Sequence, residues 1–109
     1  MQHKRVVVTG LGALTPIGNG VSAYWDGLVS GKSGCAPITY FDASKFKTQF
    51  ACELKGFDPS DYFDRKEARK MDRFTQYAMV ASDEAIEHAG FNLDSLDKTR
   101  VGVIWGAGI

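Results

Sequence analysis

The sequence lacks an excess of charge of either sign, because 13 lysines and arginines balance 13 aspartates and glutamates. A chain without net charge has no overall attraction for nucleic acid or for an anionic membrane surface. Long apolar runs are also missing, since every hydrophobic stretch is interrupted well before the ~18 residues that a membrane-spanning helix needs. The opening residues MQHKRVVVTG carry no signal-peptide pattern. We therefore expect a cytoplasmic protein with neither nucleic acid nor a membrane as partner.

Cysteine and histidine are scarce, and this limits the possible chemistry. Cys35 and Cys52 form no CxxC pair and have no histidine at metal-ligand spacing, so we expect reduced thiols rather than a disulfide. His3 and His88 are predicted to have surface or structural roles. No serine lies in a GxSxG context, and neither cysteine has a recognisable histidine partner. The sequence therefore predicts no metal site, no cofactor and no catalytic residue within these 109 residues.

The apolar residues that are present indicate an α/β domain. The run from Val6 to Thr9 and the run after Arg100, VGVIWGAGI, are typical of buried strands of the parallel kind. The glycine-rich residues 10–20 are predicted to form a loop, followed by a short helix that ends at Gly31. Residues 50–56 alternate weakly and predict another strand. Because the last residues form a turn of the kind that introduces a helix, we expect the chain to be part of a larger domain.

A long helix is the clearest predicted element. Asp64 and Glu67 have the spacing of a capping box, and Gly90 is a suitable terminator, so the helix is predicted over residues 65–89. Its apolar face is made of Met71, Phe74, Ala78, Ala81, Ala85 and Ala89. Four of these six residues are alanine. Such a face lets neighbouring backbones approach closely, and we expect it to pack tightly.

Two glycine motifs resemble phosphate-binding loops but fail in detail. A dinucleotide-binding fingerprint needs a glycine or alanine three residues after the second glycine of Gly10-x-Gly12. This sequence has Thr15 at that position, followed by Pro16. The sequence Gly31-Lys32-Ser33 lacks the earlier glycine of a P-loop, and it follows a helix rather than a strand. Neither motif predicts a nucleotide site.

A basic cluster at the start of the predicted helix is the strongest functional signal. It comprises Arg65, Lys66, Arg69, Lys70 and Arg73, and the last four have the spacing of a single helical face. Cations near a helix N-terminus oppose the helix dipole and repel one another. One interpretation is a solvated surface with Glu67 and Asp72 as counter-charges. The other is a docking surface for an acidic partner, and the neutral chain favours a protein over nucleic acid.

Several of these segments together resemble the β-ketoacyl-[acyl-carrier-protein] synthases. The opening VVVTGLGALTPIGNG is similar to the family pattern VVVTG-x-G-x-x-[ST]-P-x-G. The likeness continues through the SGKSG turn, the pair Phe41-Asp42, the segment RKEARKMDRF and the final GVIWGAGI, which resembles the GxGI turn of the family. It covers the whole chain and corresponds to the first quarter of a full-length enzyme. RKEARKMD is most similar to synthase II of bacterial type II fatty-acid synthesis.

The resemblance implies a thiolase-like, layered αβαβα fold, of which residues 1–109 would be the start of the first half, and a homodimer. It implies a decarboxylating Claisen condensation, in which an acyl group moves to a cysteine and malonyl-carrier protein loses carbon dioxide and attacks the thioester. The cysteine and two histidines are expected downstream of Ile109, so these residues alone would be inactive. Lys66, Arg69 and Lys70 are implied to bind the acyl-carrier protein, and Ile109 to line the acyl pocket.

Three other functions share the same N-terminal pattern or the same basic cluster. A polyketide ketosynthase would catalyse a related condensation. A non-catalytic chain-length partner would keep the pattern and lack the cysteine. A carrier-protein-binding module would use the cluster without any chemistry. The residues that follow Ile109 would distinguish them, because only an enzyme requires the downstream cysteine and both histidines.

Overall fold

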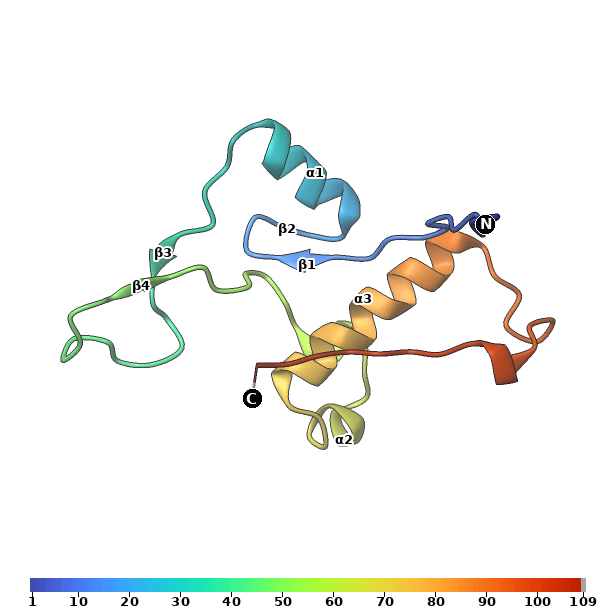
Figure 1. The fold of residues 1–109 in the computed structure, drawn as a ribbon. Helices are drawn as coiled ribbons and strands as arrows, with labels where there is room; N and C mark the ends of the chain where they lie inside the picture. Colours follow the sequence, from blue (N-terminus) through green and yellow to red (C-terminus); the bar gives the residue numbers. More distant parts are fainter. Residues whose placement is uncertain (109) are drawn as a thin grey trace.

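A computed structural model of the chain describes residues 1–108 (Figure 1). Its helices are α1 (Val21–Val29), α2 (Arg65–Ala68) and α3 (Arg73–Ala89), with 3-10 turns η1 (Pro59–Asp61) and η2 (Lys98–Arg100). Its strands are β1 (Leu14–Thr15), β2 (Gly18–Asn19), β3 (Ala36–Pro37) and β4 (Phe50–Ala51). No helix within residues 1–108 combines the length and the apolarity needed to cross a bilayer.

The strands form two short antiparallel pairs. In the first, Leu14 lies opposite Asn19 and Thr15 opposite Gly18. The Thr15 hydroxyl donates to the Gly18 carbonyl at 2.9 Å and closes the turn. Residues 10–20 therefore contain a hairpin, and the prediction of a plain loop was wrong there. The second pair joins β3 to β4, so the strand predicted over residues 50–56 is only two residues long.

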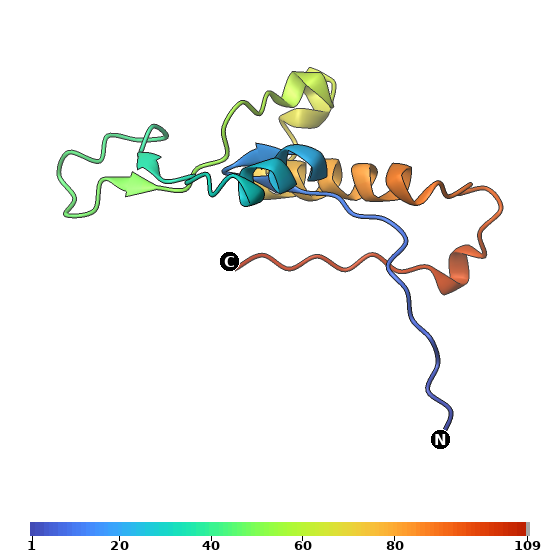
Figure 2. The ribbon, with the colours of Figure 1, turned by 90° about the horizontal axis from the view of Figure 1, so that it is seen from above.

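The two runs predicted as buried strands are extended but unpaired and exposed. Val6 is 91% exposed and Ile104 is 96% exposed. The first run leads away from the hairpins, whereas the second returns alongside α3 toward β1, and Figure 2 shows both as irregular ends of the ribbon. A strand needs a neighbour for its backbone N–H and C=O groups, and among residues 1–108 neither run pairs with one. The predicted burial is therefore wrong for the described chain.

The helix predicted over residues 65–89 is divided into α2 and α3. Asp64 caps α2 as predicted, because its carboxylate accepts from the backbone N–H groups of Lys66 at 2.7 Å and Glu67 at 2.9 Å. The chain then leaves the helix, and Asp72 is extended at φ −66° and ψ 159°. Buried Gln76 donates from Nε2 to the carbonyl of Ala68 at 2.9 Å. This hydrogen bond gives the Ala68 carbonyl a partner that the helix no longer provides, and it thereby stabilises the break. The prediction of one continuous helix was therefore wrong.

The end of α3 and its small-residue face agree with the sequence. Gly90 ends the helix in the left-handed conformation, at φ 67°. Ala81 is buried, and a Cβ atom on Gly12 would lie 2.8 Å from its carbonyl carbon. A Cβ atom on Gly10 would lie 2.9 Å from the Cβ of Ala89. The Gly10-x-Gly12 motif therefore serves close backbone packing against α3, which confirms the tight packing predicted for this face.

Candidate functional sites

The basic surface consists of Lys66, Arg69 and Lys70, and all three side chains are exposed. Lys66 lies within α2, Arg69 is the C-cap residue, and Lys70 lies in the turn that follows. Figure 1 places α2 beside the start of α3, and Figure 2 shows it on the side of α3 opposite the C-terminal segment. The three cations are thus adjacent on one short projecting unit, although they do not share the long helical face that their spacing predicted.

The expected conflict with a helix dipole is absent from the carboxyl end of this surface. Arg69 lies at the C-cap of α2, where a positive charge is favoured rather than opposed, whereas Lys66 lies near both ends of this single-turn helix. The amino end of α2 carries Asp64 instead. The sequence argument from the helix dipole was therefore wrong for Arg69 and Lys70, which lie at and beyond the carboxyl end of α2.

Arg73 is separated from the basic surface by its own contacts. Its guanidinium lies 4.8 Å from the centre of the Tyr40 ring, in a cation–π contact with the loop between β3 and β4. A hydrogen bond with the Tyr77 hydroxyl raises the pKa of Arg73 above its ordinary value, and Tyr40 makes a smaller contribution in the same direction. The Tyr40 hydroxyl in turn donates to the Leu54 carbonyl at 3.0 Å. Arg73 therefore anchors the hairpin, and it is a poor candidate for a docking residue.

Glu84 organises the glycine-rich segment, and sequence reasoning missed it. Its carboxylate accepts from the backbone N–H of Ala13 and from that of Val21, each at 2.8 Å. Val21 is the first residue of α1, whose N-cap residue, Gly20, has no side chain to offer. Glu84 therefore caps α1 from another helix, where the dipole favours a negative charge. His88 makes a third hydrogen bond between α3 and this segment, because its Nδ1 accepts from the Leu11 N–H at 3.1 Å.

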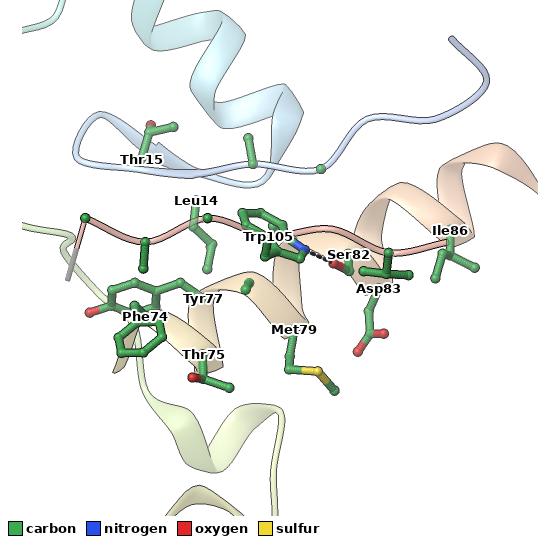
Figure 3. Close-up of a pocket in the computed structure, with 18 residues that line it drawn as sticks. Leu14, Thr15, Phe74, Thr75, Tyr77, Met79, Ser82, Asp83, Ile86 and Trp105 are labelled. Atoms are coloured by element: carbon green, nitrogen blue, oxygen red, sulfur yellow. Dashed lines mark hydrogen bonds between the residues drawn. The ribbon is translucent and has the colours of Figure 1, made fainter. Parts of the chain in front are cut away.

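An apolar groove of about 890 Å³ lies between β1, α3 and the C-terminal segment (Figure 3). Leu14, Phe74 and Ile86 line it from the first two elements, and Gly106 to Gly108 line it from the last. The Trp105 indole N–H donates to the Ser82 hydroxyl at 2.9 Å and holds the segment across α3. Ile109, predicted to line an acyl pocket, lies outside the described residues.

Other chemistry-bearing groups are dispersed. Cys35 and Cys52 are both free and exposed. Within residues 1–108, no three His, Cys, Asp or Glu side chains gather where they could hold a metal ion. Three hydroxyl groups in this part of the chain donate to carboxylates: Thr39 to Glu53, Ser60 to Asp58 and Thr99 to Asp97. All three contacts are exposed, and hydrogen bonds hold the pKa of each carboxyl below its ordinary value, which makes these carboxylates weak bases.

Comparison with known proteins gives these surfaces a context. Residues 3–109 match the family model described as the N-terminal domain of β-ketoacyl synthase, so the chain belongs to that family. Among curated relatives, it is 50% identical to 3-oxoacyl-[acyl-carrier-protein] synthase 2 of Synechocystis and 49% identical to that of Coxiella burnetii. Each match covers 100% of this chain and 26% of the relative. The chain therefore spans about a quarter of the length of these relatives, and the predicted resemblance is confirmed.

Solved structures show the same fold family. The ishigamide ketosynthase/chain length factor superposes with a TM-score of 0.74 at 40% identity, over 83% of this chain and 22% of that one. A type II polyketide acyl-carrier protein in complex with its ketosynthase matches with a TM-score of 0.62 at 29% identity, over 88% of this chain and 25% of that one. The fold is thus ketosynthase-like, although the strands of residues 1–108 do not themselves form layered sheets.

Proposed function

We propose that these residues are the N-terminal part of a β-ketoacyl-[acyl-carrier-protein] synthase that elongates fatty acids. The observation that carries the proposal is the identity of 45–50% with synthase 2 relatives over essentially the whole chain. In the complete enzyme, an acyltransferase, an acyl primer would condense with malonyl-carrier protein as carbon dioxide leaves. The catalytic cysteine and histidines would come from outside the present residues, so the 109 residues alone are expected to be inactive.

The proposal includes the assembly of the whole protein. The chain would begin the first half of a layered αβαβα, thiolase-like fold in a cytoplasmic homodimer. The exposed apolar runs support this, because Val6 to Val8 and Val103 to Trp105 are at least 59% exposed in the present chain. Apolar surface of this extent is normally covered. Neighbouring strands of the complete domain would cover it and supply the missing backbone partners.

Within this enzyme, the basic surface would bind the acidic acyl-carrier protein. Two observations support the assignment. Its three cations are exposed and project together from α2, and one structural relative is a ketosynthase in complex with its carrier protein. Charges at the rim of an interface speed encounter and set orientation more than they add to affinity. Lys66, Arg69 and Lys70 would therefore affect the binding of carrier-bound substrates rather than the chemical steps that follow.

A charge-reversal experiment on the complete enzyme tests this role. Replacing Lys66, Arg69 and Lys70 with glutamate should raise the KM for acyl-carrier protein at least about tenfold, since each unfavourable 1.4 kcal/mol is a factor of ten. Turnover of a small acyl thioester should stay unchanged. The matched control replaces exposed Lys45, Lys47 and Lys98 with glutamate, for the same change in net charge. Equal losses in the two variants, or with both substrates, would contradict docking at this surface.

The acyl pocket remains a second part of the proposal. The backbone of Gly106 to Gly108 lines the apolar groove, and Ile109 follows it directly in sequence. We expect Ile109→Phe in the complete enzyme to shift preference toward shorter primers, because overfilling a packed pocket costs about 1–3 kcal/mol. Product chain lengths measured by mass spectrometry would check this. An unchanged ratio of long to short products would make Ile109 an ordinary packing residue.

A polyketide role is the second candidate. It is favoured by both structural relatives, one a ketosynthase/chain length factor and the other a type II polyketide carrier protein with its ketosynthase. The identities favour fatty-acid synthesis, because the polyketide relatives are 40% and 29% identical, below the curated synthase 2 relatives. The products of the complete protein decide between them. Singly condensed β-ketoacyl thioesters support elongation of fatty acids, whereas multiply condensed poly-β-ketones support a polyketide synthase. Carrier-protein binding without any condensation would indicate a chain-length partner or a binding module.

A further inference from the structure

The register of the second hairpin places the two cysteines opposite each other. Ala36 pairs with Ala51, and Pro37 pairs with Phe50. One step further toward the open end, the same register places Cys35 opposite Cys52. The Ile38 N–H donates to the Gln49 carbonyl at 3.0 Å, two positions inside the Ala36–Ala51 pair. Hydrogen-bonded pairs alternate with non-hydrogen-bonded pairs in an antiparallel ladder, so the cysteines occupy a non-hydrogen-bonded position.

This position suits a covalent bond between the side chains. Opposite residues at non-hydrogen-bonded positions have Cα atoms about 4.5 Å apart, and their side chains lie on the same face. Disulfides form when the Cα atoms are about 4.4–6.8 Å apart. A displacement of one residue along either strand would place a thiol on the other face of the hairpin. The pairing thus depends on register and is not a general result of proximity.

The backbone is held on both sides of the pair. On the inner side, β3 and β4 form their ladder. On the outer side, the Lys55 ammonium donates to the Gly34 carbonyl at 2.7 Å and to the Glu53 carbonyl at 3.1 Å. Gly34 and Glu53 are the residues directly before Cys35 and after Cys52. One nitrogen therefore ties together the two backbones at the step beyond the cysteines, which keeps the register from diverging there.

We infer that Cys35 and Cys52 form a reversible cross-strand dithiol–disulfide pair. The oxidant would be a small-molecule disulfide of the glutathione class, which reaches the pair because both residues are exposed. One cysteine thiolate attacks the disulfide and releases the first thiol. The second cysteine then attacks the mixed disulfide, forms the Cys35–Cys52 bond and releases the second thiol. The two cysteines lose two hydrogen atoms, and the glutathione disulfide becomes two thiols.

Disulfide formation would close the loop between β3 and β4. This loop carries Tyr40, which contacts Arg73 at the start of α3. Closing a loop by a covalent bond restricts the unfolded chain and favours the folded hairpin. The oxidised form would therefore hold the loop against α3 more persistently than the reduced form, independently of any acyl-transfer chemistry.

The test equilibrates the chain with reduced and oxidised glutathione over a range of ratios, followed by thiol alkylation and peptide mapping without reductant. Trypsin separates the cysteines into Ser33–Lys45 and Thr48–Lys55, so a linked peptide pair is diagnostic. We expect an intramolecular disulfide. The effective concentration of the two thiols relative to each other should be at least about tenfold higher in native buffer than in urea. Equal values in both solvents, mixed glutathione disulfides as the main product, or only intermolecular links would overturn the inference.

A displaced thiol provides the matched control. In the double variant Cys35→Ser with Ala36→Cys, the thiol moves one residue along the strand to the other face of the hairpin. In this variant we expect the effective concentration in native buffer to fall to its value in urea, because the new thiol faces away from Cys52. The same effective concentration in both proteins would show that flexibility, rather than register, brings the thiols together.

Discussion

The glycine-rich segment with α3 and the two apolar ends of the chain behave in opposite ways. In the first region, Gly12 packs directly on Ala81, and Glu84 binds the backbone of Ala13 and of Val21. In the second region, Val6 and Ile104 belong to the most apolar runs of the sequence and are 91% and 96% exposed. Apolar composition alone therefore does not predict burial here.

The difference arises from where each region finds its partners. The glycine-rich segment reaches α3 inside the described chain, where its backbone meets the helix backbone and the side chains of Glu84 and His88. A β-branched run needs a flanking strand for its backbone and a covering layer for its side chains. Residues 1–108 provide no flanking strand to either end, and the side chains of Val6 and Ile104 stay almost fully exposed. Four experiments sharpen this contrast, from the largest expected effect to the smallest.

The largest effect is expected from Gly12→Val. The new side chain would meet the Ala81 backbone, which cannot move without distorting α3. We expect a loss of about 3 kcal/mol or more in the free energy of unfolding, measured by urea denaturation. Gly102→Ala is the control, since a Cβ atom there would meet nothing within 4 Å. Similar losses at both positions would show that Gly12 is not a packing residue.

Glu84→Ala should come next. It removes the acceptor of two backbone N–H groups and leaves the start of α1 uncapped, which costs about 1–3 kcal/mol. The same denaturation assay measures the loss, and amide hydrogen exchange at Val21 should accelerate. Glu87→Ala, at an exposed position on the same helix, should change stability by no more than about 0.5 kcal/mol. Unchanged exchange at Val21 would contradict the capping role.

A smaller, pH-dependent effect is expected at the second hairpin. Reduced hydration raises the pKa of Glu53, but the hydrogen bonds from Thr39 and Tyr40 outweigh it and hold the pKa below its ordinary 4.5. A depressed pKa means that the stabilisation is present above pH 4.5 and is lost as the pH falls through the folded value. Amide exchange at Thr39 should therefore accelerate on acidification. Glu53→Gln, which does not titrate, should abolish this pH dependence.

The smallest effect is expected at the ends. Val6→Thr should change the stability of this chain by less than about 0.5 kcal/mol, because its side chain contacts mainly water. Val80→Thr, at a position only 8% exposed, should cost at least about 1 kcal/mol by burying a hydroxyl group. Denaturation curves of the two variants give the comparison. A large cost at Val6 would mean that this end is covered in solution.

Much of the candidate site could be read from local residues. Charge spacing predicted a basic face of Lys66, Arg69, Lys70 and Arg73, and the first three are exposed on and next to α2, whereas Arg73 contacts Tyr40. The prediction failed on the helix that carries them, because Gln76 stabilises a break by binding the Ala68 carbonyl eight residues earlier. Helical periodicity cannot report such a bond. Glu84 was missed for the same reason, since its partner Ala13 lies 71 residues away.

The sequence by itself determined the family, the caps at Asp64 and Gly90, and the small-residue face of α3. Each of these depends on neighbouring residues or on a regular spacing, so a linear pattern is sufficient. Only the tertiary structure decided that Glu84 caps α1 and that Cys35 lies opposite Cys52. Within residues 1–108 it also left the apolar runs without strand partners. These outcomes depend on which distant backbones meet, and that is set by packing geometry rather than by local preference.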